Sequence, residues 1–166
     1  MPHAIQVAVI GAGATGSAAA LYLARRGAAV TLYDQFAFGH DRGASHGATR
    51  LFRTAYFEHP DYVPILQRAL ARWKIFEQEA GEKLFFQTGV LEAGPVEGFL
   101  LKGLREAAER HRLRVEYLDG PALRRRYPQF TFPEGYMAVF EHEAGFVLAD
   151  RTVAQQIRMA QAHGAA

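Results

Sequence analysis

Residues 6–34 constrain the fold of this chain more than any other stretch of its 166 residues. Residues 6–10 form a short apolar run rich in β-branched side chains, which is typical of a strand buried on both faces. A glycine-rich turn follows at 11–16, then a helical pattern over 17–26 and a second apolar strand over 30–33. This order predicts a βαβ unit whose two strands lie parallel, at the start of an α/β nucleotide-binding domain of the Rossmann type.

The turn has the spacing of a dinucleotide-binding loop. Its six residues are Gly11, Ala12, Gly13, Ala14, Thr15 and Gly16. In this pattern the first glycine permits the sharp turn, the second lets a pyrophosphate approach the backbone, and the third lets the helix lie close to the sheet. Amide groups at the start of the helix then bind the phosphates. We therefore predict that all six residues contribute to a cofactor site.

Asp34 closes the second strand, 18 positions after Gly16. A carboxylate at this place can accept hydrogen bonds from both hydroxyls of an adenosine ribose, and it would repel the 2′-phosphate of NADP. The turn and Asp34 therefore favour FAD or NAD, but these residues alone do not separate the two. An NAD-binding dehydrogenase stays open as an interpretation at this point.

A second distinctive segment, residues 45–56, follows a polar loop. If the chain is helical from Thr49 onward, Arg50 and Arg53 lie three residues apart and share a face. Two guanidinium groups so close together need anions beside them, and an electron-rich flavin edge and a substrate carboxylate would meet that need. The alternative is that both arginines are surface residues paired with acidic side chains.

The two motifs together resemble the monomeric sarcosine oxidase and N-methyltryptophan oxidase family, which are FAD-dependent amine oxidases of the D-amino-acid oxidase superfamily. The resemblance rests on the turn at 11–16, on Asp34, and above all on the string S-H-G-A-T-R-L-F-R at 45–53. It continues through Tyr62-Val63-Pro64 and Thr88-Gly89-Val90, so that it covers essentially the whole chain. The resemblance implies that the cofactor is FAD.

The resemblance also implies roles for individual residues. His46 and Arg50 would lie against the flavin ring as catalytic groups, and Arg53 would hold the carboxylate of the substrate. Ser45 and Thr49 would complete the cofactor site with them. The implied reaction oxidises the C–N bond of a secondary or N-methyl amino acid such as sarcosine, with dioxygen as acceptor and hydrogen peroxide as product. The alternative outside the enzymes is a nucleotide-binding fragment that is inactive on its own.

The resembled family also implies a chain that alternates between two domains. Residues 1–83 would form the first segment of the FAD-binding domain, residues 84–144 a segment of an α+β substrate domain with antiparallel strands, and residues 145–166 the return to the FAD-binding domain. We expect Asp150 to cap a final helix that runs to about His163. Because members of the family are much longer, we also expect this chain to be the N-terminal part of such a protein.

Composition excludes several other classes of function. A net charge of +2 is too small to make a nucleic-acid-binding face, and the basic cluster at 124–126 is typical of a solvated helix. The chain has no cysteines, hence neither disulfides nor thiolate metal ligands, which suits a cytoplasmic protein.

Membrane and metal sites are not expected either. Residues 4–24 carry no formal charge, but their glycines and polar side chains do not fit a membrane span. His40 and His46 lack a third ligand at a suitable spacing, so we assign no metal. The expected partners are small molecules, namely an amino-acid or amine substrate and dioxygen, and the sequence leaves the oligomeric state open.

Overall fold

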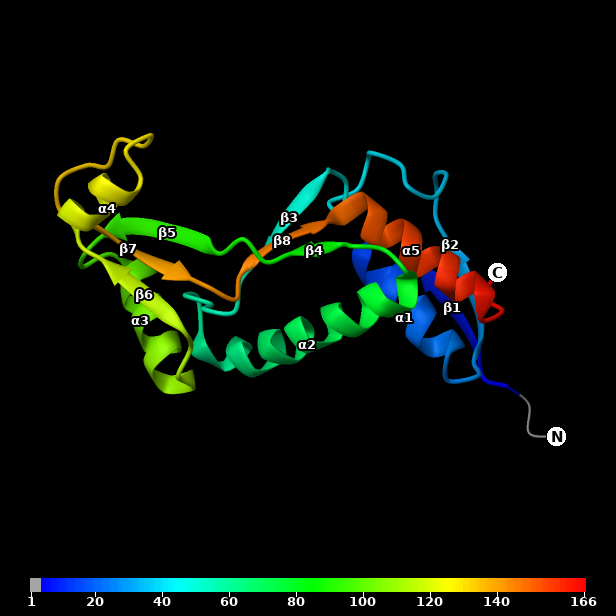
Figure 1. Cartoon of the computed structure of the whole chain (residues 1–166). Coiled ribbons are helices and arrows are strands. Elements are labelled where there is room, and N and C mark those ends of the chain that lie inside the picture. The colour runs from blue at the N-terminus through cyan, green and yellow to red at the C-terminus, as the bar shows by residue number, and fades with distance from the viewer. Residues whose placement is uncertain (1–3) are drawn as a thin grey trace. The chain divides into compact units, whose positions relative to one another are not determined.

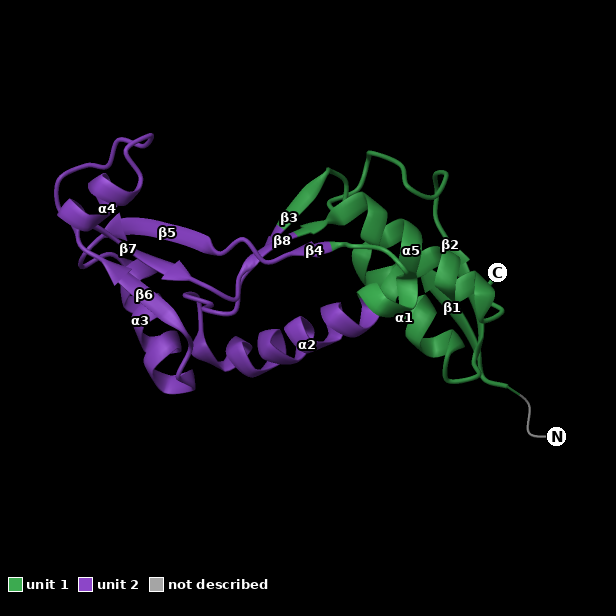
Figure 2. Cartoon of the chain, in the orientation of Figure 1, with its two compact units in different colours: residues 1–50, 77–84, 147–166 green, residues 51–76, 85–146 purple. Residues whose placement is uncertain are grey.

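The computed structural model describes residues 4–166, and the chain forms two compact units (Figures 1 and 2). Unit 1 contains the residues up to 50 together with 77–84 and 147–166, and unit 2 contains residues 51–76 and 85–146. Each unit therefore gathers segments that are distant in the sequence. The assignment of 1–83, 84–144 and 145–166 to cofactor and substrate domains stays a prediction.

Unit 1 opens with the βαβ arrangement that the sequence predicts. β1 (Gln6–Ile10) pairs in parallel with β2 (Ala29–Tyr33), and α1 (Ala14–Ala24) connects them. The register runs from Gln6 opposite Ala29 to Ile10 opposite Tyr33. The predicted α/β fold with a parallel opening pair is therefore confirmed.

Helix α5 (Ala149–Ala162) packs against α1 and completes this layer (Figure 1). The contact includes a hydrogen bond in which the buried Ser17 hydroxyl donates to Gln156 Oε1 at 2.6 Å. Ala20 and Leu21 of α1 are fully buried.

The expectation that β1 is buried on both faces is wrong. Its residues alternate between exposed and half-buried, and the Ile10 side chain is 80% exposed. Within residues 4–166 the sheet that contains β1 has β2 as its other strand, so β1 keeps one edge without a neighbouring strand. An apolar run predicts burial only where elements are present to cover both faces.

The start of α5 also differs from expectation, because Asp150 is not the N-cap. The helix begins at Ala149, and the capping position belongs to Leu148, which makes no side-chain cap. Asp150 lies in the first turn, where its charge is favoured by the helix dipole, and its carboxylate accepts a hydrogen bond from the Gly47 amide at 2.9 Å.

The segment from Thr49 is a strand, so the helix on which a shared face of Arg50 and Arg53 would depend does not form. β3 (Thr49–Phe52) belongs to a three-stranded sheet of order β3-β8-β4, with β8 at Gly145–Leu148 and β4 at Phe85–Phe86. Strand formation depends on a partner that lies far along the sequence, which a local pattern cannot reveal. Arg50 lies within β3 and Arg53 follows the end of this strand, so the two arginines do not share a helix face.

Unit 2 is built on an antiparallel sheet of order β5-β7-β6 (Figure 2). Antiparallel strands were predicted for this part of the chain. The strands are β5 (Val90–Pro95), β7 (Tyr136–Glu141) and β6 (Val115–Leu118), and the helices are η1 (Pro60–Tyr62), most of α2 (Val63–Ala80), α3 (Phe99–His111) and α4 (Gly120–Arg126).

The core of unit 2 holds the segment that follows β3. Ala55 is fully buried against Leu101 and Leu104 of α3, and Phe57 packs at the edge of the same cluster. Gly103 permits this approach, because a Cβ atom there would lie 2.0 Å from the Phe57 carbonyl oxygen. The backbone from 54 to 57 is therefore packed tightly against α3.

No helix within residues 4–166 has the length and apolar character needed to cross a membrane.

Candidate functional site

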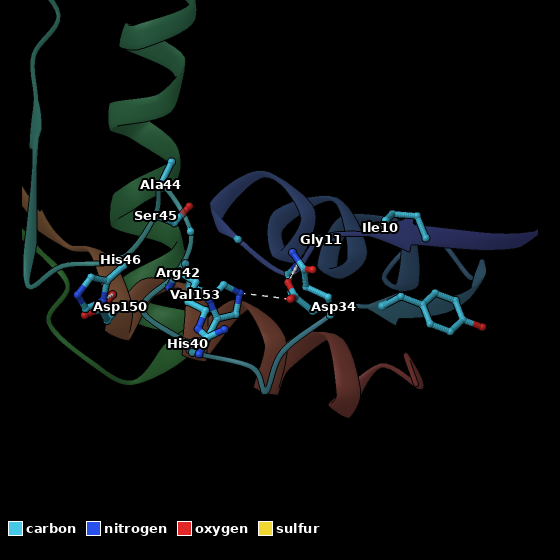
Figure 3. Close-up of a pocket in the computed structure, with 16 residues that line it drawn as sticks. Ile10, Gly11, Asp34, His40, Arg42, Ala44, Ser45, His46, Asp150 and Val153 are labelled. Carbon is cyan, nitrogen blue, oxygen red and sulfur yellow. Dashed lines mark hydrogen bonds and ion pairs between the residues drawn. The ribbon is translucent and has the colours of Figure 1, made fainter.

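A pocket of about 550 Å³ opens in unit 1 at the carboxyl ends of β1 and β2 (Figure 3). It is lined by the turn at 11–13, the loop from Gly39 to His46, and Asp150 and Val153 of α5. Ligands of parallel α/β sheets bind at this end of the strands, where the backbone turns into the following helices. The pocket is therefore the candidate site.

The glycine turn has the geometry that the sequence predicts. Gly11 has a φ of +95°, which favours glycine, and its amide donates to the Tyr33 carbonyl at 2.7 Å. A Cβ atom on Gly16 would lie 1.7 Å from the Gly11 carbonyl oxygen, so the first turn of α1 can lie against the loop only with glycine there. The turn and the helix are thus held in close contact.

Ser45 reaches the N-terminus of α1. Its hydroxyl oxygen accepts a hydrogen bond from the Ala14 amide at 2.9 Å, and a Cβ atom on Gly13 would lie 3.0 Å from the same oxygen. Ser45 thus satisfies one of the free amides at the start of the helix, as a capping side chain does. A residue from the second motif therefore lies beside the first.

Two backbone amides hold the Asp34 carboxylate just after the C-terminal end of β2. Its Oδ2 accepts from the Ala12 amide at 2.8 Å, and its Oδ1 accepts from the Phe36 amide at 3.1 Å. These two hydrogen bonds lower the pKa of Asp34 below its ordinary value; burial acts against them, and the neighbouring His40 lowers the pKa further. The carboxylate is therefore ionised at neutral pH.

His40 is a site residue that the sequence did not single out for this role. Its Nε2 lies 3.2 Å from Asp34 Oδ1, and its Nδ1 accepts the Arg42 amide at 3.0 Å (Figure 3). The hydrogen of the neutral ring therefore lies on Nε2, where it can be donated to Asp34. Within residues 4–166 no three His, Cys, Asp or Glu side chains are grouped so that they could hold a metal ion.

We expect replacement of Asp34 by asparagine to weaken FAD binding about tenfold, because a charged acceptor for the ribose hydroxyls is lost. A pKa lowered on folding adds stability at pH values above the unfolded pKa, and this contribution is lost as the pH falls through the folded value. The stability difference between wild type and variant should therefore be constant near neutrality and shrink below about pH 4. Denaturant unfolding at a series of pH values measures it.

Asp41→Asn is the matched control, because Asp41 lies exposed in the same loop outside the pocket. We expect its FAD affinity and its pH profile to follow those of the wild type. Equal behaviour of the two variants would contradict the role of Asp34.

His46 and Gly47 are joined to the first turn of α5. His46 Nδ1 lies 3.8 Å from Asp150 Oδ1, the oxygen that also accepts the Gly47 amide, and the Ala149 amide donates to the Ala48 carbonyl at 3.1 Å. His46 is half exposed and lines the pocket together with Asp150. The sequence alone predicts Asp150 only as a helix cap, because nothing local links it to His46.

Arg50 folds back on its own loop. Its guanidinium donates to the carbonyls of Ala44 at 2.8 Å, His46 at 2.7 Å and Thr49 at 3.0 Å. No ion pair joins it to a carboxylate among residues 4–166. Its positive charge is therefore not neutralised by a neighbouring acid there, while its donors hold the loop at 44–49.

Arg53 lies in unit 2 and is paired with two carboxylates. Its Nη1 lies 2.6 Å from Glu92 and its Nη2 lies 3.0 Å from Glu58, while the guanidinium carbon is 5.0 Å and 4.7 Å from the ring centroids of Tyr56 and Phe57. Burial opposes the charged form, but hydrogen bonding to Glu92 and the charges of both acids outweigh it and raise the pKa of Arg53. Burial raises the pKa of Glu92, although Arg53 acts against it. Arg53 thus makes the acidic pairing that was the alternative at the sequence level.

The structure brings part of the predicted set into one pocket. The predicted residues that line it are Gly11, Ala12, Gly13, Asp34, Ser45 and His46. Ala14, Thr15 and Gly16 form the first turn of α1 behind it, whereas Thr49 and Arg50 lie on β3 outside its lining.

Comparison with known proteins identifies the family to which the chain belongs. The sequence model of the family described as FAD dependent oxidoreductase (DAO) matches residues 6–166. Monomeric sarcosine oxidase from Arthrobacter sp. (strain TE1826) is 39% identical over 160 residues, which is 96% of this chain and 41% of that protein. N-methyl-L-tryptophan oxidase from Yersinia pestis (strain Pestoides F) is 38% identical over 150 residues, 90% of this chain and 40% of that protein. The chain thus spans about two fifths of the length of these relatives, and the resemblance seen in the sequence is confirmed.

Solved structures give the same result for the fold. NikD, an amino acid oxidase essential for nikkomycin biosynthesis, superposes with a TM-score of 0.82 at 26% identity, over 97% of this chain and 42% of NikD. L-proline dehydrogenase from P. horikoshii has a TM-score of 0.78 at 22% identity, over 99% of this chain and 44% of that one, and shows a shared fold.

Proposed function

The chain belongs to the FAD dependent oxidoreductase family, and on that premise we propose that the protein oxidises the C–N bond of a secondary or N-methyl amino acid such as sarcosine. The observation that carries this proposal is the similarity to two enzymes, sarcosine oxidase and N-methyl-L-tryptophan oxidase, whose names both denote N-methylated amino acids. Dioxygen would be the acceptor and hydrogen peroxide the product.

The described residues fit an FAD cofactor, which is the cofactor of this family. Gly13 places no side chain of its own at the approach to α1, where the Ser45 hydroxyl binds the Ala14 amide, and Asp34 presents an ionised carboxylate at the end of β2. We propose that Gly11 to Gly16 hold the pyrophosphate and Asp34 the adenosine ribose. Ser45, His46, Thr49 and Arg50 would contact the remainder of the cofactor.

The substrate would be held through its carboxylate by Arg53. The guanidinium can bind a carboxylate with two parallel hydrogen bonds, but its fork is already engaged by Glu58 and Glu92. Glu58 is the partner that a substrate can replace, because its side chain is 39% exposed whereas that of Glu92 is 11% exposed. Glu92 would then keep the guanidinium in place during binding.

Two further residues would act on charge and on protons. Arg50, whose cation is held by loop carbonyls, would stabilise negative charge that develops beside it. His46 can hold a proton on Nδ1 toward the Asp150 carboxylate.

When bound, FAD supplies the acceptor for the two electrons and the hydrogen that leave the carbon next to the nitrogen, and it passes the electrons to dioxygen. Water hydrolyses the resulting imine, which gives a primary amine and an aldehyde.

The test is peroxide release by the purified, FAD-loaded protein. We expect a yellow protein that forms peroxide with sarcosine or N-methyl-L-tryptophan and much less with glycine, which has no N-methyl group to oxidise. A protein that turns over these amines only with a nicotinamide cofactor, or one that binds flavin but oxidises no N-alkyl amino acid, would refute the proposal. A protein that binds a dinucleotide but shows neither activity would support the alternative of an inactive nucleotide-binding fragment.

The surroundings of the reaction are part of the same proposal. The partners would be small molecules, the amino-acid substrate and dioxygen, and the protein would act in the cytoplasm. The lack of cysteines is compatible with a reducing compartment.

A further inference from the structure

Glu141 is a buried carboxylate that the proposed reaction does not use. It ends the central strand β7 of unit 2, its residue is 1% exposed, and no ion pair joins it to a basic side chain within residues 4–166. A charge buried in this way is costly unless hydrogen bonds compensate for it. The groups that donate hydrogen bonds to Glu141 therefore indicate which part of the structure its side chain holds.

All of these donors belong to the two residues that follow Arg53. Glu141 Oε1 accepts the Thr54 amide at 2.7 Å and also the Thr54 hydroxyl, and Oε2 accepts the Ala55 amide at 3.1 Å. Two consecutive backbone amides thus bind the two oxygens of one carboxylate. This arrangement fixes the direction of the peptide plane on either side of Thr54.

Strand pairing does not require a carboxylate at this position. In the sheet Glu141 lies opposite Val90 of β5 and Val115 of β6, so an apolar side chain would suit its neighbours. The carboxylate instead reaches out of the sheet to the segment at 54–55.

The same segment also carries the two aromatic rings that lie against the Arg53 guanidinium. Tyr56 and Phe57, which flank the guanidinium, are the next residues along the backbone. Gly103 receives the Phe57 carbonyl at the far end of the segment, and Glu141 binds its near end. The backbone that sets the direction of Arg53 is therefore held at both ends.

We propose that Glu141 is a positioning residue for Arg53: by binding the amides of Thr54 and Ala55 it orients the guanidinium that receives the substrate carboxylate. This inference rests on the proposed function of Arg53. It predicts that loss of the carboxylate acts on substrate binding more than on the chemical step, since Glu141 itself lies behind the backbone and not beside the reacting atoms.

The decisive variant is Glu141→Gln in the FAD-loaded protein. Glutamine keeps the size of the side chain but puts an NH2 group against donors, so at least one of the three hydrogen bonds must be lost. We expect KM for sarcosine to rise about tenfold while kcat stays within about twofold and the flavin content is unchanged. Glu134→Gln, which changes an exposed glutamate in a loop of the same unit, is the control and should match the wild type.

Two comparisons separate positioning from a general loss of stability. In an Arg53→Lys background Glu141→Gln should add little to KM, because residues that act through one another are not additive. Thr54→Val removes the hydroxyl donor but keeps both amides, so it should raise KM less than Glu141→Gln does. If Glu141→Gln does not fold, Thr54→Val decides the question by the same KM and kcat split.

A readout without turnover keeps this inference separate from the proposed function. In substrate-free protein, hydrogen exchange of the Thr54 and Ala55 amides should accelerate about tenfold or more in Glu141→Gln. The NMR chemical shift of the Arg53 Nε–H group should also change, because the guanidinium is no longer held in one orientation. If the wild type oxidises no N-methyl amino acid, the proposed function fails while this measurement still tests Glu141. Unchanged exchange and an unchanged Arg53 resonance, or a KM increase that is fully additive with Arg53→Lys, would overturn the proposal.

Discussion

Gly16→Ala is expected to destabilise unit 1 by about 3 kcal/mol and to abolish FAD retention. A Cβ atom at this position would lie 1.7 Å from the carbonyl oxygen of Gly11 and 2.9 Å from its carbonyl carbon. Both are backbone atoms, so no side chain can rotate away to make room. The turn must therefore move off α1, and the amides that would bind phosphate move with it. Thermal unfolding and the ratio of flavin to protein absorbance measure the two effects.

Gly43→Ala is the matched control in the same unit. Its Cβ atom would meet only the Cε1 of His40, at an ordinary contact distance of 3.4 Å. We expect its unfolding temperature to stay close to that of the wild type. A Gly16→Ala protein as stable as Gly43→Ala, with normal flavin content, would show that the turn can relax and that the close approach is not needed.

Arg53→Lys should weaken the binding of amino-acid substrates between about tenfold and a hundredfold, which corresponds to the loss of a charge-assisted hydrogen bond. Lysine keeps the positive charge but loses the planar fork that fits a carboxylate. It also cannot bridge Glu58 and Glu92 in the way the guanidinium does at 3.0 Å and 2.6 Å. Flavin content should remain near normal, because Arg53 is assigned to the substrate. Steady-state KM values and the bound flavin absorbance test this expectation.

Arg50→Lys serves as the contrasting variant. Lysine cannot reach the carbonyls of Ala44, His46 and Thr49 together, so the loop at 44–49 loosens and flavin reduction slows. Substrate affinity should change less than in Arg53→Lys. If Arg53→Lys instead loses its flavin while amines bind normally, the two roles are reversed. An unchanged enzyme would make both arginines surface residues without a part in the reaction.

The parts of the site that could be predicted from the sequence depend on contacts within one βαβ unit. The parallel pair, the turn against α1, and Asp34 at the strand end follow from a single stretch of chain, and Asp34 bonds Ala12 only 22 residues away. The family resemblance added FAD, which agrees with the family match, whereas the roles that it implies for the string at 45–53 stay predictions.

The parts that could not be predicted depend on partners far along the chain. β3 is a strand because it is paired in a sheet with β8. Asp150 lies near His46 because α5, which begins more than 100 residues later, packs beside the loop, and the Gly47 amide donates to Asp150 across a separation of 103 residues. Glu141 binds Thr54 across 87 residues. No local periodicity carries such information, so the helix expected from Thr49 and the cap expected at Asp150 failed for the same reason.

The interleaving of segments has a consequence for biosynthesis. α1 packs on α5, and the hydrogen bond between Ser17 and Gln156 joins residues 139 positions apart. At ribosomal speeds of about 5–20 residues per second, α1 waits roughly 7–28 s before α5 is made. The segments of unit 2, which end at residue 146, are synthesised before that. During this interval the face of α1 that later packs on α5 has no partner from that helix, so it stays exposed on the nascent chain until residues 149–162 have been made.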